Sequence, residues 1–146
     1  MGTFVSVSLK IPYKKLPDGE GRIRLLCRDS SQHCAANQKC SSLERFEAII
    51  DSGATRCVFH ADIGKAIGLD VEAGEIESTL GIAGSTNMYL HDISLYAPGG
   101  IIAIRAGFSI DLPVAGLLGM TGFFDNFKIT FDAIGRHCEL ERLFRA

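Results

Sequence analysis

The stretch of chain from residue 46 to residue 55 reads FEAIIDSGAT. Its first five residues form a short, mostly apolar run, which is typical of a buried strand. Asp51 follows directly, so the sequence predicts a carboxylate at the end of that strand, in a turn with Ser52 and Gly53. Burial raises the pKa of such a carboxyl group, whereas hydrogen bonds from backbone N–H groups lower it. General acid–base catalysis uses groups whose pKa is perturbed in this way. Asp-Ser-Gly by itself equally fits an ordinary turn in which Gly53 supplies a positive φ.

Short segments of alternating or continuous apolar character extend outward from this stretch in both directions. We expect strands at residues 5–11, 22–27, 46–50, 76–80, 88–96, 101–104, 127–131 and 138–143. Apolar residues at helical spacing predict a short amphipathic helix over 61–69, closed by Gly68, and a helical turn is expected after Gly119 through Phe124. Many short strands separated by turn signals predict a single all-β barrel domain over residues 1–146, with one or two short helices.

Composition narrows the classes of function. Hydrophobic residues make up 47% of the 146 residues, which excludes a disordered chain. The formal net charge of −2 lacks the basic excess of a nucleic-acid binder or of a protein held at a membrane surface. No apolar run is long enough to span a bilayer, and no signal peptide is visible, so we expect a cytoplasmic location.

Three of the five cysteines fall in or next to a polar stretch, residues 28–42, which we interpret as a surface loop. Cys27, Cys34 and Cys40 are seven and six residues apart, which is wider than the close cysteine pairs of structural zinc sites. We therefore expect reduced thiols and no metal; a reversible Cys34–Cys40 disulfide is an alternative that the sequence leaves open.

Several motifs occur in the order typical of one protease family. The sequence IIDSGAT at residues 49–55 resembles the signature of the aspartic proteases, and GLLG at 116–119 resembles the apolar-apolar-Gly element that packs beside it. Between them, GIAG at 81–84 is similar to the glycine-rich flap of retropepsins, and residues 118–132 are similar to the tail of cellular and bacterial retropepsin-like enzymes. The resemblance covers roughly residues 46–143 and implies a small closed retropepsin-like barrel.

The resemblance also implies a mechanism. Catalysis in this family needs two facing carboxylates that share a proton, and this chain has one such signature, so a homodimer with Asp51 from each subunit is implied, without metal or cofactor. Ser52 would hydrogen-bond across the dimer axis, and Gly53 would offer its backbone to the carboxylate and to the substrate. Ala54 lacks the hydroxyl of pepsin-type enzymes, which predicts a mildly acidic optimum, roughly pH 4.5–6.5.

The residues expected to bind a peptide or protein substrate come from three segments. Thr55 and Arg56 stand where retroviral members carry acidic residues. Arg56 would either favour acidic substrate positions or simply pair with a surface acid. The remaining candidates are in the expected flap hairpin, residues 76–96, and beside the signature: Ile82, Ala83, Gly84 and Leu117.

Two further interpretations stay open for Leu117 and for the whole chain. Leu117 fits a core position as well as a wall of the substrate pocket. The implied barrel, whose C-terminal hairpin is expected over residues 127–143, would also suit a catalytically silent dimeric module for peptide binding or assembly. Replacing Asp51 separates the two functions, because proteolysis would vanish while dimerisation and peptide binding persist.

Overall fold

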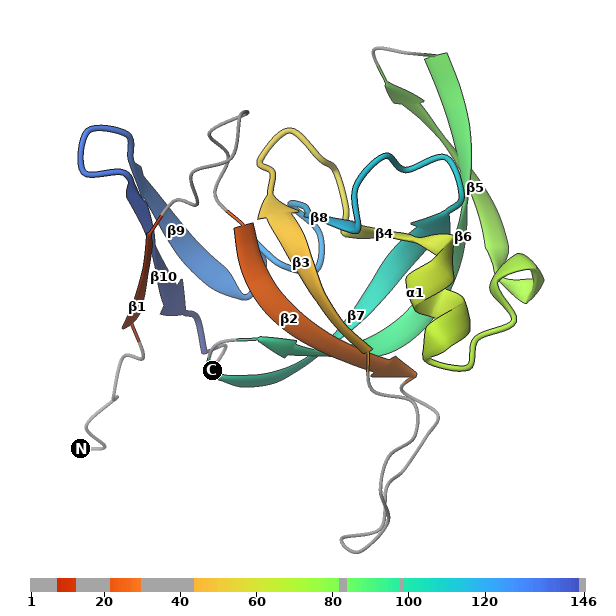
Figure 1. The fold of residues 1–146 in the computed structure, drawn as a ribbon, viewed down its shortest axis with the longest axis horizontal. Coiled ribbons are helices and arrows are strands. Elements are labelled where there is room, and N and C mark those ends of the chain that lie inside the picture. Colours follow the sequence, from red (N-terminus) through yellow and green to blue (C-terminus); the bar gives the residue numbers. More distant parts are fainter. Residues whose placement is uncertain (1–7, 13–21, 30–43, 82–83, 98, 145–146) are drawn as a thin grey trace, which may run out of the picture.

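Figure 1 shows the computed structural model of the chain, which describes residues 8–12, 22–29, 44–81, 84–97 and 99–144. The strands within these residues are β1 (Ser8–Pro12), β2 (Arg22–Asp29), β3 (Glu44–Ile50), β4 (Val58–His60), β5 (Glu75–Gly81), β6 (Gly84–Ala97), β7 (Gly100–Ser109), β8 (Gly116–Leu118), β9 (Phe127–Asp132) and β10 (His137–Arg142). One α-helix, α1 (Ala61–Ala66), and one 3-10 helix, η1 (Val71–Ala73), complete the described elements. The prediction of an all-β fold with one or two short helices is confirmed.

The larger of two sheets closes on itself. Its strand order is β2-β3-β8-β4-β7-β6-β5, and β2 also pairs with β6, so β2, β3, β8, β4, β7 and β6 form a ring. The 14-residue strand β6 makes this closure possible, because its first half pairs with β5 and its second half with β2. The β5–β6 hairpin therefore projects beyond the ring, at the upper right of Figure 1.

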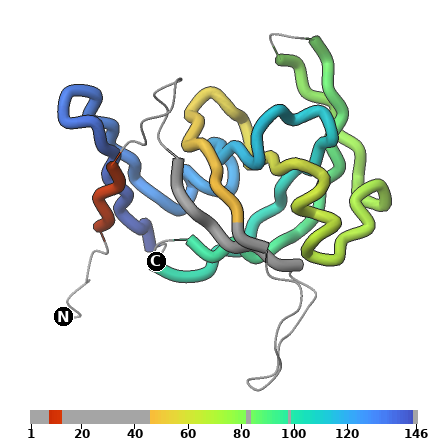
Figure 2. The backbone as a smooth tube through the Cα atoms, viewed as in Figure 1, coloured from red at the N-terminus to blue at the C-terminus, as the bar shows by residue number. Residues whose placement is uncertain are grey.

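The second sheet has the order β1-β10-β9, with antiparallel pairing throughout. Figure 2 shows β1 and the β9–β10 hairpin on the side of the molecule opposite the β5–β6 hairpin. Phe127, Cys138 and Leu140 of this sheet belong to the same buried cluster as the barrel core. The two sheets are therefore packed together around one continuous core.

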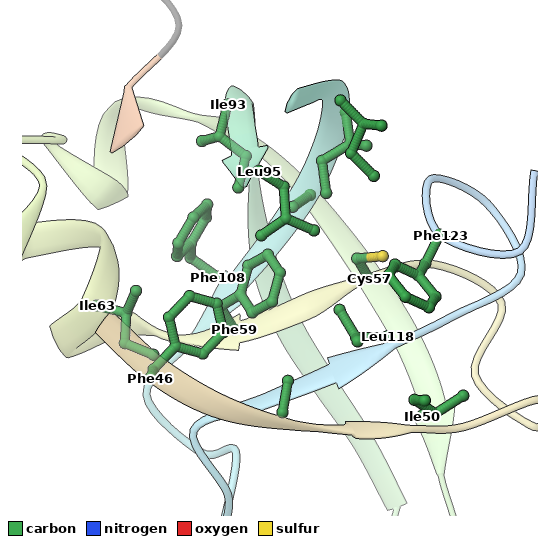
Figure 3. Close-up of a cluster of buried hydrophobic side chains, with 14 of the residues drawn as sticks. Phe46, Ile50, Cys57, Phe59, Ile63, Ile93, Leu95, Phe108, Leu118 and Phe123 are labelled. Atoms are coloured by element: carbon green, nitrogen blue, oxygen red, sulfur yellow. The ribbon is translucent and has the colours of Figure 1, made fainter. Parts of the chain in front are cut away.

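Three aromatic rings from three different strands fill the centre of the barrel (Figure 3). Phe59 of β4 has no exposed surface; its ring centroid lies 5.1 Å from that of Phe46 and 5.8 Å from that of Phe108. Such edge-on and tilted contacts add to the free energy that burial of the rings provides. The packing of Phe59 fixes β4 between β7 and β8, and so fixes one end of the loop that β4 follows.

Helix α1 begins directly after β4. The Nδ1 atom of His60 accepts a hydrogen bond from the backbone N–H of Asp62 at 3.1 Å and so caps the first turn. Gly68 has φ +91° and its N–H bonds to the carbonyl of Lys65, which confirms the predicted glycine ending. The helix is shorter than expected, because α1 ends at Ala66 rather than at residue 69.

Strands β4 and β8 were not among the predicted strands, and two other sequence predictions were wrong in extent or type. Strand β7 covers ten residues rather than residues 101–104 alone, since antiparallel pairing with β6 continues to Phe108. No helix forms between Gly119 and Phe124. There Gly122 has φ +105°; its N–H donates to Asp125 at 3.1 Å, and its carbonyl accepts from the Asn126 side chain at 2.7 Å, so side chains hold this segment in turns.

Among the described residues, no helix is both long and apolar enough to cross a membrane.

Candidate active site

The loop that carries Asp51 crosses the end of β8. Strand β8 lies between β3, with which it pairs in parallel, and β4, with which it pairs in antiparallel orientation. The chain leaves β3 at Ile50 and returns in β4 at Val58, so residues 51–57 connect two strands that both flank β8. Leu117 is opposite Ile49 on one side and Val58 on the other. Figure 1 shows this loop in yellow at the end of the molecule from which the β5–β6 hairpin also projects.

Backbone hydrogen bonds fasten this loop to the last residue of β8 and to the segment that follows it. The N–H of Asp51 donates to the carbonyl of Leu118 at 3.0 Å. Two bonds of 2.9 Å run the other way, from Met120 to the carbonyl of Ala54 and from Thr121 to that of Thr55. These bonds join backbone atoms, and Arg56 and Thr121 form an isolated β-bridge in the same region. They therefore fix the path of the loop rather than a single side chain.

Gly119 permits this close approach. A Cβ atom at Gly119 would overlap the carbonyl oxygen of Arg56 and lie 2.7 Å from that of Ala54. Both neighbours are backbone atoms that cannot rotate away. The glycine of the GLLG motif is therefore a steric requirement of the loop that holds Asp51.

The Asp51 carboxylate is held by its own turn. Its Oδ1 atom accepts a hydrogen bond of 2.8 Å from the N–H of Gly53, and its backbone carbonyl accepts one of 3.2 Å from Ala54. This side-chain-to-backbone bond is an Asx turn, as the Asp-Ser-Gly sequence predicts, but Gly53 does not have the positive φ expected for it. Asp51 and Ala54 are half-buried, whereas Ser52, Gly53 and Thr55 are exposed. The carboxylate is thus fixed in direction while its turn stays open to solvent or to another molecule.

Arg56 makes the contact that joins this loop to the hairpin. Its Nη2 atom lies 2.9 Å from Oε2 of Glu77 on β5, and both side chains are partly buried. Pairing with an acid was one of the two alternatives that the sequence left open for Arg56. Glu77 itself was missed, because the alternation of β5 shows which residues share a face but not which distant loop that face meets.

The other candidate residues for substrate binding come from β8 and from the expected flap hairpin. Leu117 is half-buried in β8, between β3 and β4. Gly84 begins β6 with φ +115°, is exposed, and pairs with Gly81 across the hairpin. Ile82 and Ala83 lie outside the described residues. Of the polar loop expected over residues 28–42, residues 28 and 29 belong to β2 and 30–42 lie outside the described residues.

Cys57 ends the loop and is fully buried. Burial raises the pKa of its thiol to about 11, although backbone hydrogen bonds from Gly119 and Phe123 act in the opposite direction. At neutral pH this sulfur is protonated and enclosed, so it lacks the thiolate character of a nucleophile. Within the described ranges, no group of three His, Cys, Asp or Glu side chains is placed to hold a metal ion.

The fold can be compared with known proteins. No protein-family model matches the chain, and no curated protein matches it in sequence. A crystal structure of a retropepsin-like aspartic protease from Rickettsia conorii is similar over 97% of this chain and 98% of that chain, with a TM-score of 0.65 and 15% sequence identity. The EIAV protease complexed with the inhibitor HBY-793 aligns over 68% of this chain and 81% of that chain, with a TM-score of 0.49 and 16% identity. The similarity to the Rickettsia conorii structure shows that the chain has the retropepsin-like fold that its motifs predict.

Proposed function

We propose that this protein is an aspartic endopeptidase that is active as a homodimer, formed by one domain over residues 1–146, in the cytoplasm. The observation that carries the proposal is the Asp51 turn: a half-buried carboxylate accepts the Gly53 N–H at 2.8 Å, in a loop fastened beside Gly119. Its setting in a retropepsin-like fold supports the assignment. General acid–base chemistry requires a carboxylate that is both positioned and accessible, and Asp51 meets both conditions.

A second carboxylate is needed for the reaction. The chain contains one Asp-Ser-Gly sequence, so the second must come from another copy of the chain. Two carboxylates about 3 Å apart share one proton, because like charges at that distance cannot both ionise. The exposure of Ser52 and Gly53 in the single chain is consistent with a partner that covers them.

Each carboxyl group of the dyad has its own role in peptide hydrolysis. The ionised Asp51 removes a proton from a water molecule as the water oxygen attacks the scissile carbonyl carbon. The protonated Asp51 of the partner subunit hydrogen-bonds to the carbonyl oxygen and stabilises the charge that develops there. The proton taken from water is then delivered to the leaving amine as the C–N bond breaks. No metal or cofactor takes part in this scheme.

Substrate binding is assigned to the segments that surround the turn. We propose that the β5–β6 hairpin is a flap that closes over an extended peptide, with Ile82, Ala83 and Gly84 at its tip. Gly53 and Thr55 would hydrogen-bond the peptide main chain, while Leu117 would contribute an apolar wall. Arg56 takes part through its ion pair with Glu77.

The proposal is tested by digesting a diverse peptide library between about pH 4 and pH 7. Wild-type protein and the Asp51→Asn variant are compared at low and high protein concentration. Asparagine keeps an oxygen that accepts the Gly53 N–H, so the variant retains its fold. We expect cleavage by the wild type alone, rising faster than linearly with protein concentration. Equal cleavage by both proteins contradicts the role of Asp51, and a folded wild-type dimer that cleaves nothing is a peptide-binding or assembly module instead.

A further inference from the structure

The Arg56–Glu77 ion pair connects the two segments between which the proposed substrate would lie. Arg56 is in the Asp51 loop, and Glu77 is in the first strand of the hairpin. Their side chains are 21% and 39% exposed, so the pair is neither fully solvated nor sealed in the core. The Nε atom of Arg56 is buried without a hydrogen-bond partner among the described residues. Because this Nε–H is shielded from solvent, a bound peptide could reach the guanidinium only through its Nη groups, one of which bonds to Glu77.

The contact also shows which face of the hairpin is turned toward the Asp51 loop. Alternate residues of a strand share a face, so Thr79 lies on the same face of β5 as Glu77. Their cross-strand partners on β6 are Thr86 and Met88. Met88 is only 3% exposed, so the body of the molecule covers this face at the level of Glu77, whereas Thr79 is exposed. On this face, nearer the tip than the ion pair and the buried Met88, lie two hydroxyl side chains, Thr79 and Thr86.

The apolar residues of β5 are on its other face. Ile76 and Leu80 are 61% and 85% exposed, and between them Ser78 donates a hydrogen bond of 2.7 Å to Asn87. Apart from the buried Met88, the face that carries Glu77 therefore presents hydroxyl and charged groups, while the exposed apolar side chains of β5 are on the opposite face. A peptide side chain held next to Arg56 would meet hydrogen-bonding groups rather than an apolar surface.

We propose that the Arg56–Glu77 pair, with Thr79 and Thr86, selects peptides that place a neutral hydrogen-bonding side chain beside it, namely Asn, Gln, Ser or Thr. This inference rests on the proposed function and names its substrate class. A carboxamide or hydroxyl both donates and accepts, so it bonds to the guanidinium and to the carboxylate at once. A charged side chain is attracted by one member of the pair and repelled by the other, and a large apolar one desolvates the pair without replacing its lost water.

The test separates the two charges. Peptides randomised one position at a time are digested with the wild type, Arg56→Gln and Glu77→Gln. Arg56→Gln leaves an unbalanced carboxylate, so the preference shifts toward Lys and Arg, by about fivefold in kcat/KM. Glu77→Gln leaves an unbalanced guanidinium, so the preference shifts toward Asp and Glu by a similar factor. The charge-swapped double variant Arg56→Glu/Glu77→Arg restores the neutral preference.

The chain offers a matched control. Arg105 of β7 and Glu75 of β5 form an ion pair with the same N–O distance of 2.9 Å, and this pair joins β5 to the barrel instead of to the Asp51 loop. Glu75→Gln removes the same charge from the same strand and leaves the preference unchanged. An equal shift with Glu75→Gln overturns the inference, as does an unaltered preference in both Arg56→Gln and Glu77→Gln.

Peptide capture by the Asp51→Asn variant separates this inference from the proposed protease activity. If the wild type cleaves nothing but Asp51→Asn retains peptides with Asn, Gln, Ser or Thr at one position, the selectivity holds and the endopeptidase assignment fails. If peptides are cleaved without that preference, the endopeptidase assignment holds and the selectivity fails. If peptides are neither cleaved nor captured, both are overturned.

Discussion

The backbone N–H of Asp51 donates a hydrogen bond to the carbonyl oxygen of Leu118, with 3.0 Å between nitrogen and oxygen. The bond continues the parallel pairing of β3 with β8 by one residue beyond Ile50. It therefore sets the point at which the chain leaves the sheet, and with it the direction of the Asp51 side chain. Leu118, the last residue of β8, thus helps to set the geometry of the proposed catalytic carboxylate although it carries no catalytic group.

Gly119→Ala tests that control. The added methyl group overlaps the carbonyl oxygen of Arg56, so the loop has to shift. We expect kcat/KM to fall more than tenfold and the free energy of unfolding to fall by about 1–3 kcal/mol. For the measurement of stability, Gly81→Ala is the control, because its Cβ would lie 3.8 Å from the carbonyl oxygen of Gly84. Wild-type activity in Gly119→Ala contradicts the steric role.

Ser52→Ala tests the proposed dimer. Ser52 is exposed in the single chain, and a hydrogen bond across the dimer axis would be lost with its hydroxyl. We expect the dimer dissociation constant to rise by about tenfold, measured by analytical ultracentrifugation, while the melting temperature of the monomer stays unchanged. Dimer affinity equal to that of the wild type would place Ser52 outside the interface.

Phe59→Ala tests the core that supports the loop. Phe59 has no exposed surface and contacts Phe46 and Phe108, so its truncation should cost about 3–5 kcal/mol in the free energy of unfolding. Ile134→Ala is the matched truncation at the surface, since Ile134 is 98% exposed, and it should change stability by less than about 0.5 kcal/mol. Urea denaturation measures both, and similar losses in the two variants would contradict the assigned core.

The buried thiol of Cys57 predicts a pH dependence of stability. Its pKa of about 11 in the folded chain lies above the ordinary value of 9.0, so between these values the unfolded thiol ionises and the folded one does not. The unfolded state then binds fewer protons, and the free energy of unfolding falls as pH rises, by up to about 1.4 kcal/mol per pH unit from this group.

The measurement is denaturant unfolding at several pH values between 8 and 11, with Cys57→Ala as the reference. The variant should lose stability less steeply with pH than the wild type. Burial also raises the pKa of Cys138, which both proteins retain, so the difference between their slopes reports Cys57 alone. Equal slopes would mean that the Cys57 thiol titrates normally in the folded chain.

Local pattern was sufficient to predict most of the strands and the Asp51 turn, but not the three-residue strands β4 and β8 next to the Asp51 loop. Alternation and short apolar runs depend on neighbouring residues, and the Asx turn needs only Asp51 and Gly53. The place of Gly119 beside the turn followed from resemblance to known motifs, because nothing in the local sequence states which backbone a glycine will touch.

What could not be predicted depends on partners distant in sequence. The extent of β7 is set by its pairing with the long strand β6, and the turns after Gly119 are set by side-chain bonds from Asp125 and Asn126. The Arg56–Glu77 pair forms only once the β5–β6 hairpin has folded and lies next to the Asp51 loop. Each of these features depends on tertiary contacts, which local sequence patterns do not specify.

The parallel pairing of β3 with β8 has a consequence for how the protein is made. Asp51 reaches its final geometry only when Leu118, Met120 and Thr121 have folded back against its loop. Such long-range contacts form slowly, because a large loop has to close first. A chain still emerging from the ribosome therefore lacks an assembled catalytic loop, and under the proposed function this delay withholds proteolysis until synthesis of the barrel is nearly complete.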